Sequence, residues 1–296
     1  MRKIGFLIAD GSSFAKQNPE NVCQQLKELG YSAIEWTTDF LNPFCKSSDE
    51  ISEIVKLSNS YGLEVGEVVV QKDLIVTSIE EYEKNTEYII KCIESYSKAG
   101  IKTINLFTGP RPWIENAIRV GYDIDYSEAW NRAFSSFDKF VVAAEKHNMN
   151  LAVEGVWGHL CRDFFSTWFL ITHYASNNLG VNYDPSHDIL AGNTDVGWTI
   201  RQWGKNRIKN IHLKDAVGWY MNDTVGQMKD TRFVFPIFGE GKVNWKSFIT
   251  ALDEIGYDGA MSVEFESFDY LNNVLDGDMY KAAEISINNI RKVFGE

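Results

Sequence analysis

The chain repeats one pattern eight times: a short apolar run and then an amphipathic segment, with no linker or low-complexity stretch between repeats. The first repeat is KIGFLIA (residues 3–9) followed by NVCQQLKELG (21–30), in which Val22, Leu26 and Leu29 share one helical face. Most of the later runs are short, rich in β-branched residues and bounded by turn residues, as buried parallel strands are. Eight strand–helix units predict an α/β fold, a (β/α)₈ TIM barrel that spans residues 1–296 as a single domain.

The chain length is compatible with the barrel but does not select it, whereas the positions of the glycines support it. The 296 residues fit one barrel, for which ~250 is typical, but they also fit two small domains. Gly30, Gly62, Gly100 and Gly256 stand just before strand-like runs, where a helix must stop and the chain must turn inward. A doubly wound open sheet has the same periodicity, yet no GxGxxG motif follows the first run.

Four runs in the second half each end in a residue that can bind a metal. They are NLAVE (150–154), LGVNYD (179–184), IKNIH (208–212) and GAMSVE (259–264), which end in Glu154, Asp184, His212 and Glu264. Singly, each has an ordinary explanation as a helix cap, a salt-bridge partner or a buried histidine. Together they end strands five to eight in unbroken order, and the carboxyl ends of barrel strands converge on one face.

This convergence predicts a single divalent cation held by those four residues, because three carboxylates buried together need a compensating positive charge. An oxygen-rich site with one imidazole favours Mn²⁺, with Mg²⁺, Co²⁺ or Zn²⁺ as alternatives. Such a cation can stabilise the enediolate that forms when a hydroxy-ketone loses a proton beside its carbonyl.

Composition excludes several kinds of partner. A net charge of −12 and a pI near 5.0 disfavour nucleic acid, whose binders usually present a basic face. The four cysteines at 23, 45, 92 and 161 form no CxxC pair, which is typical of reduced thiols. No segment approaches a membrane span or a signal sequence, so we expect a cytoplasmic protein with a small-molecule substrate and, by default, a homo-oligomer.

Two long loops leave the carboxyl face and carry aromatic residues. One runs from Thr108 to about Tyr126 and the other from Lys214 to Val243. Trp113 and Trp219 on these loops are expected to stack on a sugar ring or an aromatic aglycone; the alternative is that they pack the loops onto the barrel. Glu35 and Glu67 on early strands are expected at the mouth as substrate contacts or as ordinary strand-end acids.

Glu154, DPSH (184–187), IHLKD (211–215), GEGKVNW (239–245) and VEFE (263–266) together resemble the sugar phosphate isomerase/epimerase superfamily, whose fold is the xylose-isomerase-like barrel. The resemblance covers essentially the whole chain. The superfamily includes ketose 3-epimerases, hydroxypyruvate isomerase, inosose isomerases and dehydratases, and the large subunit of C-glycoside deglycosidases. The motif set is specific for the superfamily and weak for any one member.

The resemblance implies roles for individual residues. In ketose 3-epimerases the first and last metal-binding glutamates also transfer the proton, which corresponds to Glu154 and Glu264. His187 matches a histidine that contacts a substrate oxygen; the alternative is a loop histidine that points outward. Lys214 either meets a substrate oxyanion or forms an ion pair with Asp215.

The chain also departs from the ketose 3-epimerase pattern. Those enzymes carry a further glutamate and an arginine where this chain has Leu160 and Gly218. His159 stands beside the first of these positions, in a GVWGH turn, and is a candidate base or substrate contact, with a structural role as the alternative. The superfamily's zinc endonuclease branch uses histidines from early strands, whereas the first histidine here is His147.

These features favour a metal-dependent sugar or keto-sugar isomerase or epimerase that abstracts a proton and forms an enediolate. The alternative is a lyase that uses the same enolate for β-elimination, as an inosose dehydratase or a C-glycoside deglycosidase acting on 3-oxo-glycosides. In the deglycosidase case a hetero-oligomer with a small subunit is expected. A third alternative is a sugar or metal binder without activity.

Overall fold

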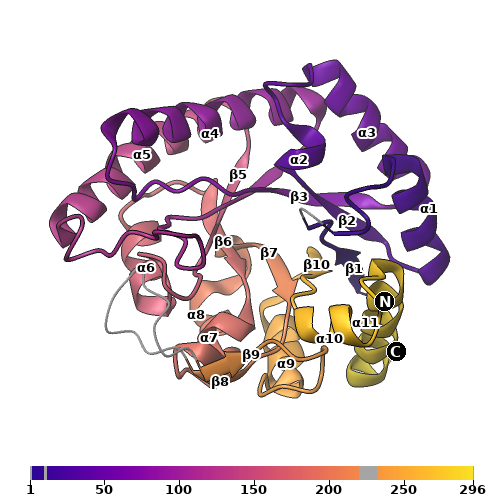
Figure 1. Ribbon diagram of the computed structural model, residues 1–296. Coiled ribbons are helices and arrows are strands. Elements are labelled where there is room, and N and C mark those ends of the chain that lie inside the picture. Colours follow the sequence, from indigo (N-terminus) through magenta and orange to yellow (C-terminus); the bar gives the residue numbers. More distant parts are fainter. Residues whose placement is uncertain (1, 10–11, 220–231, 296) are drawn as a thin grey trace.

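The computed structural model describes residues 2–9, 12–219 and 232–295, and within them eight parallel strands form one sheet surrounded by helices (Figure 1). The sheet order is β1–β10–β7–β6–β5–β4–β3–β2. The strands are β1 (Lys3–Phe6), β2 (Ala33–Thr37), β3 (Glu64–Val70), β4 (Thr103–Leu106), β5 (Asn150–Glu154), β6 (Leu179–Tyr183), β7 (Ile208–Leu213) and β10 (Ala260–Val263). A parallel bridge between Leu7 and Glu35 joins the two end strands and closes the ring. The predicted (β/α)₈ barrel is therefore confirmed.

The helices follow the strands in the expected alternation. They are α1 (Pro19–Leu29), α2 (Thr38–Leu41), α3 (Ser48–Ser60), α4 (Ile79–Ala99), α5 (Tyr126–His147), α6 (Phe164–Thr172), α7 (Pro185–Leu190), α8 (Val196–Arg207), α9 (Trp245–Ile255), α10 (Phe268–Asn273) and α11 (Met279–Phe294). Local sequence sets their ends: Asn18 caps α1, Pro19 occupies its first turn, and Gly30 ends it with φ 87°. The four cysteines carry free thiols.

Local contacts set some of the boundaries. Helix α6 begins at Phe164 because the Asp163 carboxylate accepts from the Ser166 amide and caps the helix. The DPSH motif, whose structure was not predicted, opens the short helix α7. The long loop after β7 contains an antiparallel hairpin of β8 (Val217–Trp219) and β9 (Arg232–Val234).

In the described residues, no helix has the length and apolar character needed to cross a membrane. The main apolar core lies between the strands and the helices, with fully buried rings such as Trp36, Phe137 and Phe248. Polar residues are buried as well: Glu35 and Glu67 are 0% exposed.

Candidate metal centre

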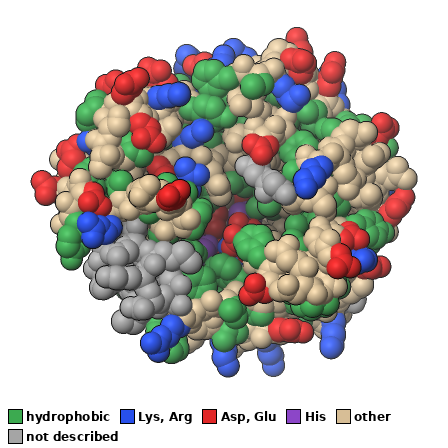
Figure 2. Space-filling view, in the orientation of Figure 1, with side chains coloured by type: hydrophobic (Ala, Val, Ile, Leu, Met, Phe, Trp, Pro, Cys, Tyr) green, Lys and Arg blue, Asp and Glu red, His purple; other side chains and the backbone are tan. Residues whose placement is uncertain are grey.

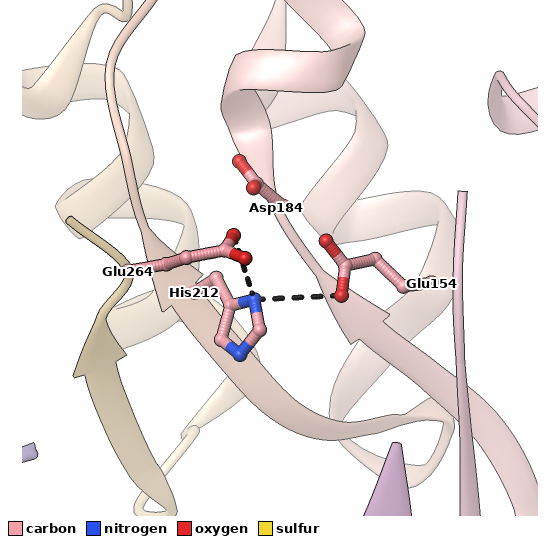
Figure 3. Close-up of side chains that lie close together, drawn as sticks. All are labelled: Glu154, Asp184, His212 and Glu264. Atoms are coloured by element: carbon pink, nitrogen blue, oxygen red, sulfur yellow. Dashed lines mark ion pairs between the residues drawn. The ribbon is translucent and has the colours of Figure 1, made fainter. Parts of the chain in front are cut away.

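Glu154, Asp184, His212 and Glu264 lie together and point toward one another (Figure 3). One candidate ligand atom from each lies within 4.8 Å of the others. The imidazole Nδ1 of His212 is 3.4 Å from Glu154 Oε2 and 3.2 Å from Glu264 Oε2. Figure 2 shows acidic and histidine side chains at the bottom of a hollow in the middle of the face, so the cluster is reached from the mouth of the barrel.

Strand ends and register bring these residues to one level. Glu154 is the last residue of β5 and lies opposite Asn182 on β6. His212 on β7 lies opposite Ser262 on β10, and Glu264 directly follows β10. Asp184 directly follows β6, where its Oδ1 accepts from the Ser186 amide 2.8 Å away and caps α7.

Two atoms of the cluster are suited to a cation because they are buried among charged groups: Asp184 Oδ2 lies 3.0 Å from Lys214 Nζ, and His212 Nδ1 lies between the carboxylates of Glu154 and Glu264. Three carboxylates buried around one imidazole need positive charge, part of which Lys214 supplies and the rest of which a divalent cation would supply. With Glu154 and Glu264, they form the donor set of three carboxylates and one histidine that a divalent ion accepts. The residues present therefore fit a divalent cation.

The cluster holds the carboxylates of Glu154 and Glu264 in the ionised form. Burial alone would raise the pKa of Glu154, but the charge of His212 and hydrogen bonds from His187 and His212 bring it well below its ordinary value. Burial also opposes ionisation of Glu264, yet Lys214 and His212 lower the pKa of that carboxyl to about 2. Burial lowers the pKa of His212, and the facing carboxylates of Glu154, Glu264 and Glu35 outweigh burial and raise it well above its usual value.

Lys214 lies at the rim of the cluster and is bound to three carboxylates. Its Nζ is 2.5 Å from Glu264 Oε2, 2.9 Å from Glu266 Oε2 and 3.0 Å from Asp184 Oδ2. Burial lowers the pKa of Lys214, but these carboxylates raise it well above its usual range, so the amine is an ammonium. Glu266 was not singled out from the sequence; its place two residues after Glu264, on the same side of an extended segment, is the signal that could have found it.

The alternative ion pair between Lys214 and Asp215 is wrong. Asp215 is 1% exposed and points the other way, into the loop before α9. Its Oδ1 accepts from the amides of Ala216 and Val243, and its Oδ2 accepts from the amides of Gly239 and Gly241 and from the Trp245 indole, all at 3.0–3.2 Å. The Asp of IHLKD therefore holds the GEGKVNW segment in place.

The two predicted site histidines occupy different surroundings. His187 is within reach of the cluster, since its Nε2 lies 3.4 Å from Glu154 Oε1, Asp184 Oδ2 and Lys214 Nζ. His159 is fully buried, and neither of its ring nitrogens has a hydrogen-bond partner among the described residues. Burial, aided by the nearby charge of His187, lowers the pKa of His159 to about 3. His159 is thus a neutral imidazole, and neither nitrogen is hydrogen-bonded within the described part of the chain.

Aromatic rings form a continuous row beside the cluster. Trp113 stacks on His159 with ring centroids 5.4 Å apart and contacts Trp157 at 5.5 Å. Trp157 contacts Phe233 at 4.9 Å, Phe233 contacts Phe235 at 5.3 Å, and the Phe235 ring lies 4.8 Å from Lys214 Nζ. Trp219 ends β8 and is 51% exposed; in the described part of the chain it takes no place in this row.

The two positions that depart from the ketose 3-epimerase pattern have structural explanations. Leu160 is fully buried, and its amide donates to the carbonyl of Gly109. Gly218 lies in the β8–β9 hairpin with φ +109°, and a Cβ there would lie 1.9 Å from the Arg232 carbonyl oxygen. This backbone excludes an arginine at position 218.

Glu35 and Glu67, expected at the mouth, lie instead on the far side of His212. The Nε2 of His212 is 3.1 Å from Glu35 Oε2 and 3.5 Å from Glu67 Oε1. Burial, followed by the charge of Glu35, raises the pKa of Glu67 to about 8, so this carboxyl is protonated at neutral pH. The position of a carboxyl group on a strand does not show by itself that the group will lie beneath the cluster and not at the mouth of the barrel.

The family model of the xylose isomerase-like TIM barrel matches residues 23–289, and the chain belongs to this family. None of the curated proteins matches it in sequence. The fold is similar to IolI protein with a bound zinc atom (16% identity, 98% of this chain and 97% of that chain, TM-score 0.73). It is also similar to D-psicose 3-epimerase from Clostridium cellulolyticum H10 (16%, 98% and 99%, 0.73) and to 3-keto-D-glucoside 4-epimerase YcjR from E. coli (14%, 99% and 100%, 0.71).

Proposed function

We propose that this chain is an isomerase or epimerase of a sugar or keto-sugar that depends on one divalent cation. The observation that carries the proposal is the convergence of Glu154, Asp184, His212 and Glu264 in the mouth of the barrel. The printed names of the structural relatives, D-psicose 3-epimerase and 3-keto-D-glucoside 4-epimerase, support a substrate of this class.

The proposed ligands are Glu154, Asp184, His212 and Glu264, and the proposed ion is Mn²⁺, with Mg²⁺, Co²⁺ or Zn²⁺ as alternatives. The relative with a bound zinc atom supports a divalent cation in a protein of this fold. When bound, the cation would polarise the substrate carbonyl and stabilise the negative charge of the enediolate. Metal analysis of the purified protein and calorimetric titration with each ion would identify it.

Glu154 and Glu264 are the proposed proton-transfer groups. Both are held as carboxylates by neighbouring positive charge, and a base must be unprotonated before it can remove a proton from carbon. They approach the centre of the cluster from different strands, so one can remove a proton while the other returns it. Lys214 is an ammonium 2.5 Å from Glu264 and can donate a hydrogen bond to a developing oxyanion.

The remaining proposed roles concern substrate binding. His187 contacts Glu154 and Asp184 and can donate to a substrate hydroxyl. His159 is proposed as a neutral base or hydrogen-bond partner for the substrate, because both of its nitrogens are without partners among the described residues. Trp113 and Trp219 are proposed to stack on the sugar, and Trp113 has the stronger support because it contacts His159.

Deuterium exchange tests the reaction type directly. The protein is incubated in D₂O with Mn²⁺ and separately with ketoses, inososes and 3-keto-glycosides, and carbon-bound deuterium is measured by NMR. Incorporation beside a carbonyl is expected for at least one substrate, because the proton returned to carbon comes from a carboxyl group that has exchanged with D₂O. Failure to exchange with all three classes would contradict the proposal.

Glu264→Gln tests the site. The amide cannot act as a base and is a weaker ligand, so turnover should fall by about 10³-fold or more and Mn²⁺ affinity should also fall. Glu254→Gln is the matched control, because Glu254 is paired with Arg201 on the outside of the barrel. Full activity and full metal content in Glu264→Gln would refute the assignment.

The second candidate is a lyase that expels an aglycone or water from the same enolate. The lyase is favoured by the row of aromatic rings formed by Trp113, Trp157, Phe233 and Phe235. This row offers more aromatic surface than a single sugar ring needs. Release of a free aglycone from an aryl 3-keto-glycoside would select the lyase, whereas an epimeric glycoside would select the isomerase.

We also propose a homo-oligomer, a cytoplasmic location and a single domain over residues 1–296. The exposed aromatic rings of α6 support self-association: Phe165 is 75% exposed and Phe169 is 54% exposed, while no residue of this helix is charged. Light scattering of the purified protein tests the oligomer. Co-purification with a small subunit would instead indicate the hetero-oligomer expected of a deglycosidase.

A further inference from the structure

The imidazole of His212 lies between two acidic groups on opposite sides. On the side of the metal centre its Nδ1 faces Glu154 and Glu264, and on the other side its Nε2 faces Glu35 and Glu67. His212, Glu35 and Glu67 are all 0% exposed, so water does not compete for either nitrogen. An imidazole that binds a metal gives up one of its two protons, and which nitrogen keeps the other depends on these neighbours.

A metal can bind only the imidazole nitrogen that carries a lone pair, while the other nitrogen keeps its hydrogen. Glu35 Oε2 lies 3.1 Å from Nε2, at hydrogen-bond distance, and an ionised carboxylate can only accept. We propose that Glu35 is a positioning residue that keeps the proton on His212 Nε2 and so turns the lone pair of Nδ1 toward the cation. This inference rests on the proposed cation site.

Glu35 is itself held by a directional chain of amides. Asn182 Nδ2 donates to Glu154 Oε2 at 3.0 Å, which leaves Asn182 Oδ1 to accept from Asn210 Nδ2 at 3.3 Å. Asn210 Nδ2 also donates to Glu35 Oε1 at 2.6 Å. Because both ends of this chain are carboxylates, neither amide can be reversed without setting two acceptors or two donors against each other. The chain thus connects two candidate ligands, Glu154 and His212, through the inside of the barrel.

This direction makes Glu35→Gln a sharp test. Asn210 donates to one end of the residue 35 side chain, so the glutamine must place its oxygen there and turn its NH₂ toward His212. An NH₂ group facing Nε2 requires a lone pair on Nε2 and moves the proton to Nδ1, where the cation would bind. The variant is nearly isosteric, so the lost function would come from proton position and not from a cavity.

Glu67 provides the matched control. It is equally buried, but its Oε1 is 3.5 Å from Nε2, and its carboxyl oxygens have no hydrogen bond within the described residues. Glu67→Gln leaves the contact of Glu35 with His212 intact. Glu35→Asp is a second test variant, because it keeps a carboxylate acceptor on a shorter side chain.

The experiment measures Mn²⁺ binding to the metal-free full chain by calorimetry and the nitrogen coupling of bound Mn²⁺ by pulsed EPR. Glu35→Gln should bind Mn²⁺ about 10- to 100-fold more weakly and lose the coupling of a directly bound imidazole. Glu67→Gln should keep the coupling and an affinity close to wild type, and Glu35→Asp should keep the coupling with intermediate affinity. Circular dichroism checks that each variant is folded.

The outcomes separate this inference from the proposed function. Wild-type protein that binds no divalent ion would overturn both. Wild type that binds Mn²⁺, with Glu35→Gln equal to it in affinity and nitrogen coupling, would overturn the role of Glu35 alone. Loss of coupling in Glu67→Gln as well as in Glu35→Gln would overturn the assignment to Glu35 in particular. If Glu35→Gln does not fold, a folded Glu35→Asp whose Mn²⁺ affinity equals that of the wild type would overturn the assignment.

Discussion

Replacing Asp215 with asparagine tests how the end of β7 is joined to the loop before α9. The carboxylate accepts five hydrogen bonds, two on Oδ1 and three on Oδ2, and is 1% exposed. An asparagine has only one acceptor oxygen. At best this oxygen would accept the three hydrogen bonds that Oδ2 accepts in the wild type. Its NH₂ group would then face two buried N–H donors.

Each buried donor left without an acceptor costs about 1–3 kcal/mol, so the free energy of unfolding should fall by about 2–6 kcal/mol. That is a large part of the ~5–15 kcal/mol that typically stabilises a domain. Urea denaturation followed by circular dichroism measures the loss, and hydrogen exchange at the Gly241 and Val243 amides, which both donate to Asp215, should speed up.

Asp258→Asn is the control, because the Asp258 side chain is 81% exposed and pairs with Lys205 across the surface. This variant should unfold at the wild-type urea concentration. A loss below about 1 kcal/mol in Asp215→Asn, with unchanged exchange at Gly241 and Val243, would refute the reasoning that this carboxylate holds the segment.

Three further predictions follow from the site and its surroundings. Gly218→Arg should lower the melting temperature, with about 1–3 kcal/mol of backbone strain, and should not raise epimerase activity; a stable, more active variant would contradict the hairpin geometry. Burial raises the pKa of Asp188 from 3.8 to about 6, so its ionisation opposes folding above that pH. Lowering the pH from 8 to 5 should therefore stabilise wild type about 1.4 kcal/mol more than Asp188→Asn in urea denaturation, and equal gains would rule this out. Removing metal with a chelator should lower the melting temperature, and Mn²⁺ at 1,000 times its Kd should restore about 4 kcal/mol; a melting temperature indifferent to Mn²⁺ would count against the site.

The barrel and the quartet can be predicted from the sequence because both depend on local patterns. Parallel strands buried on both faces give continuous apolar runs, and a ligand residue at the end of such a run must lie at the carboxyl face. Glu154, Asp184, His212 and Glu264 all follow this rule, and they lie together in the structure. The rule needs no knowledge of how distant segments pack.

Other features depend on which residues meet across the barrel, and the sequence does not contain that information locally. Glu35 is 177 residues from His212, and its contact exists only once the ring has closed. The partners of Asp215 are mostly backbone amides, and the residue types in a sequence do not show which backbone amides will bind a given side chain. The hairpin that excludes a side chain at Gly218 lies in a loop with no strand-like periodicity.

The closing bridge between β1 and β2 has a consequence for folding. The Glu35 carbonyl accepts the Ile8 amide at the seam where the ring closes, and the Glu35 side chain reaches His212 across the interior. A chain fragment that begins after β2 would still contain Glu154, Asp184, His212 and Glu264. It would lack the residue proposed to orient the imidazole, so a chain truncated at its amino-terminal side would carry the proposed ligands without the finished centre. The proposed centre is therefore complete only when the two end strands of the sheet have met.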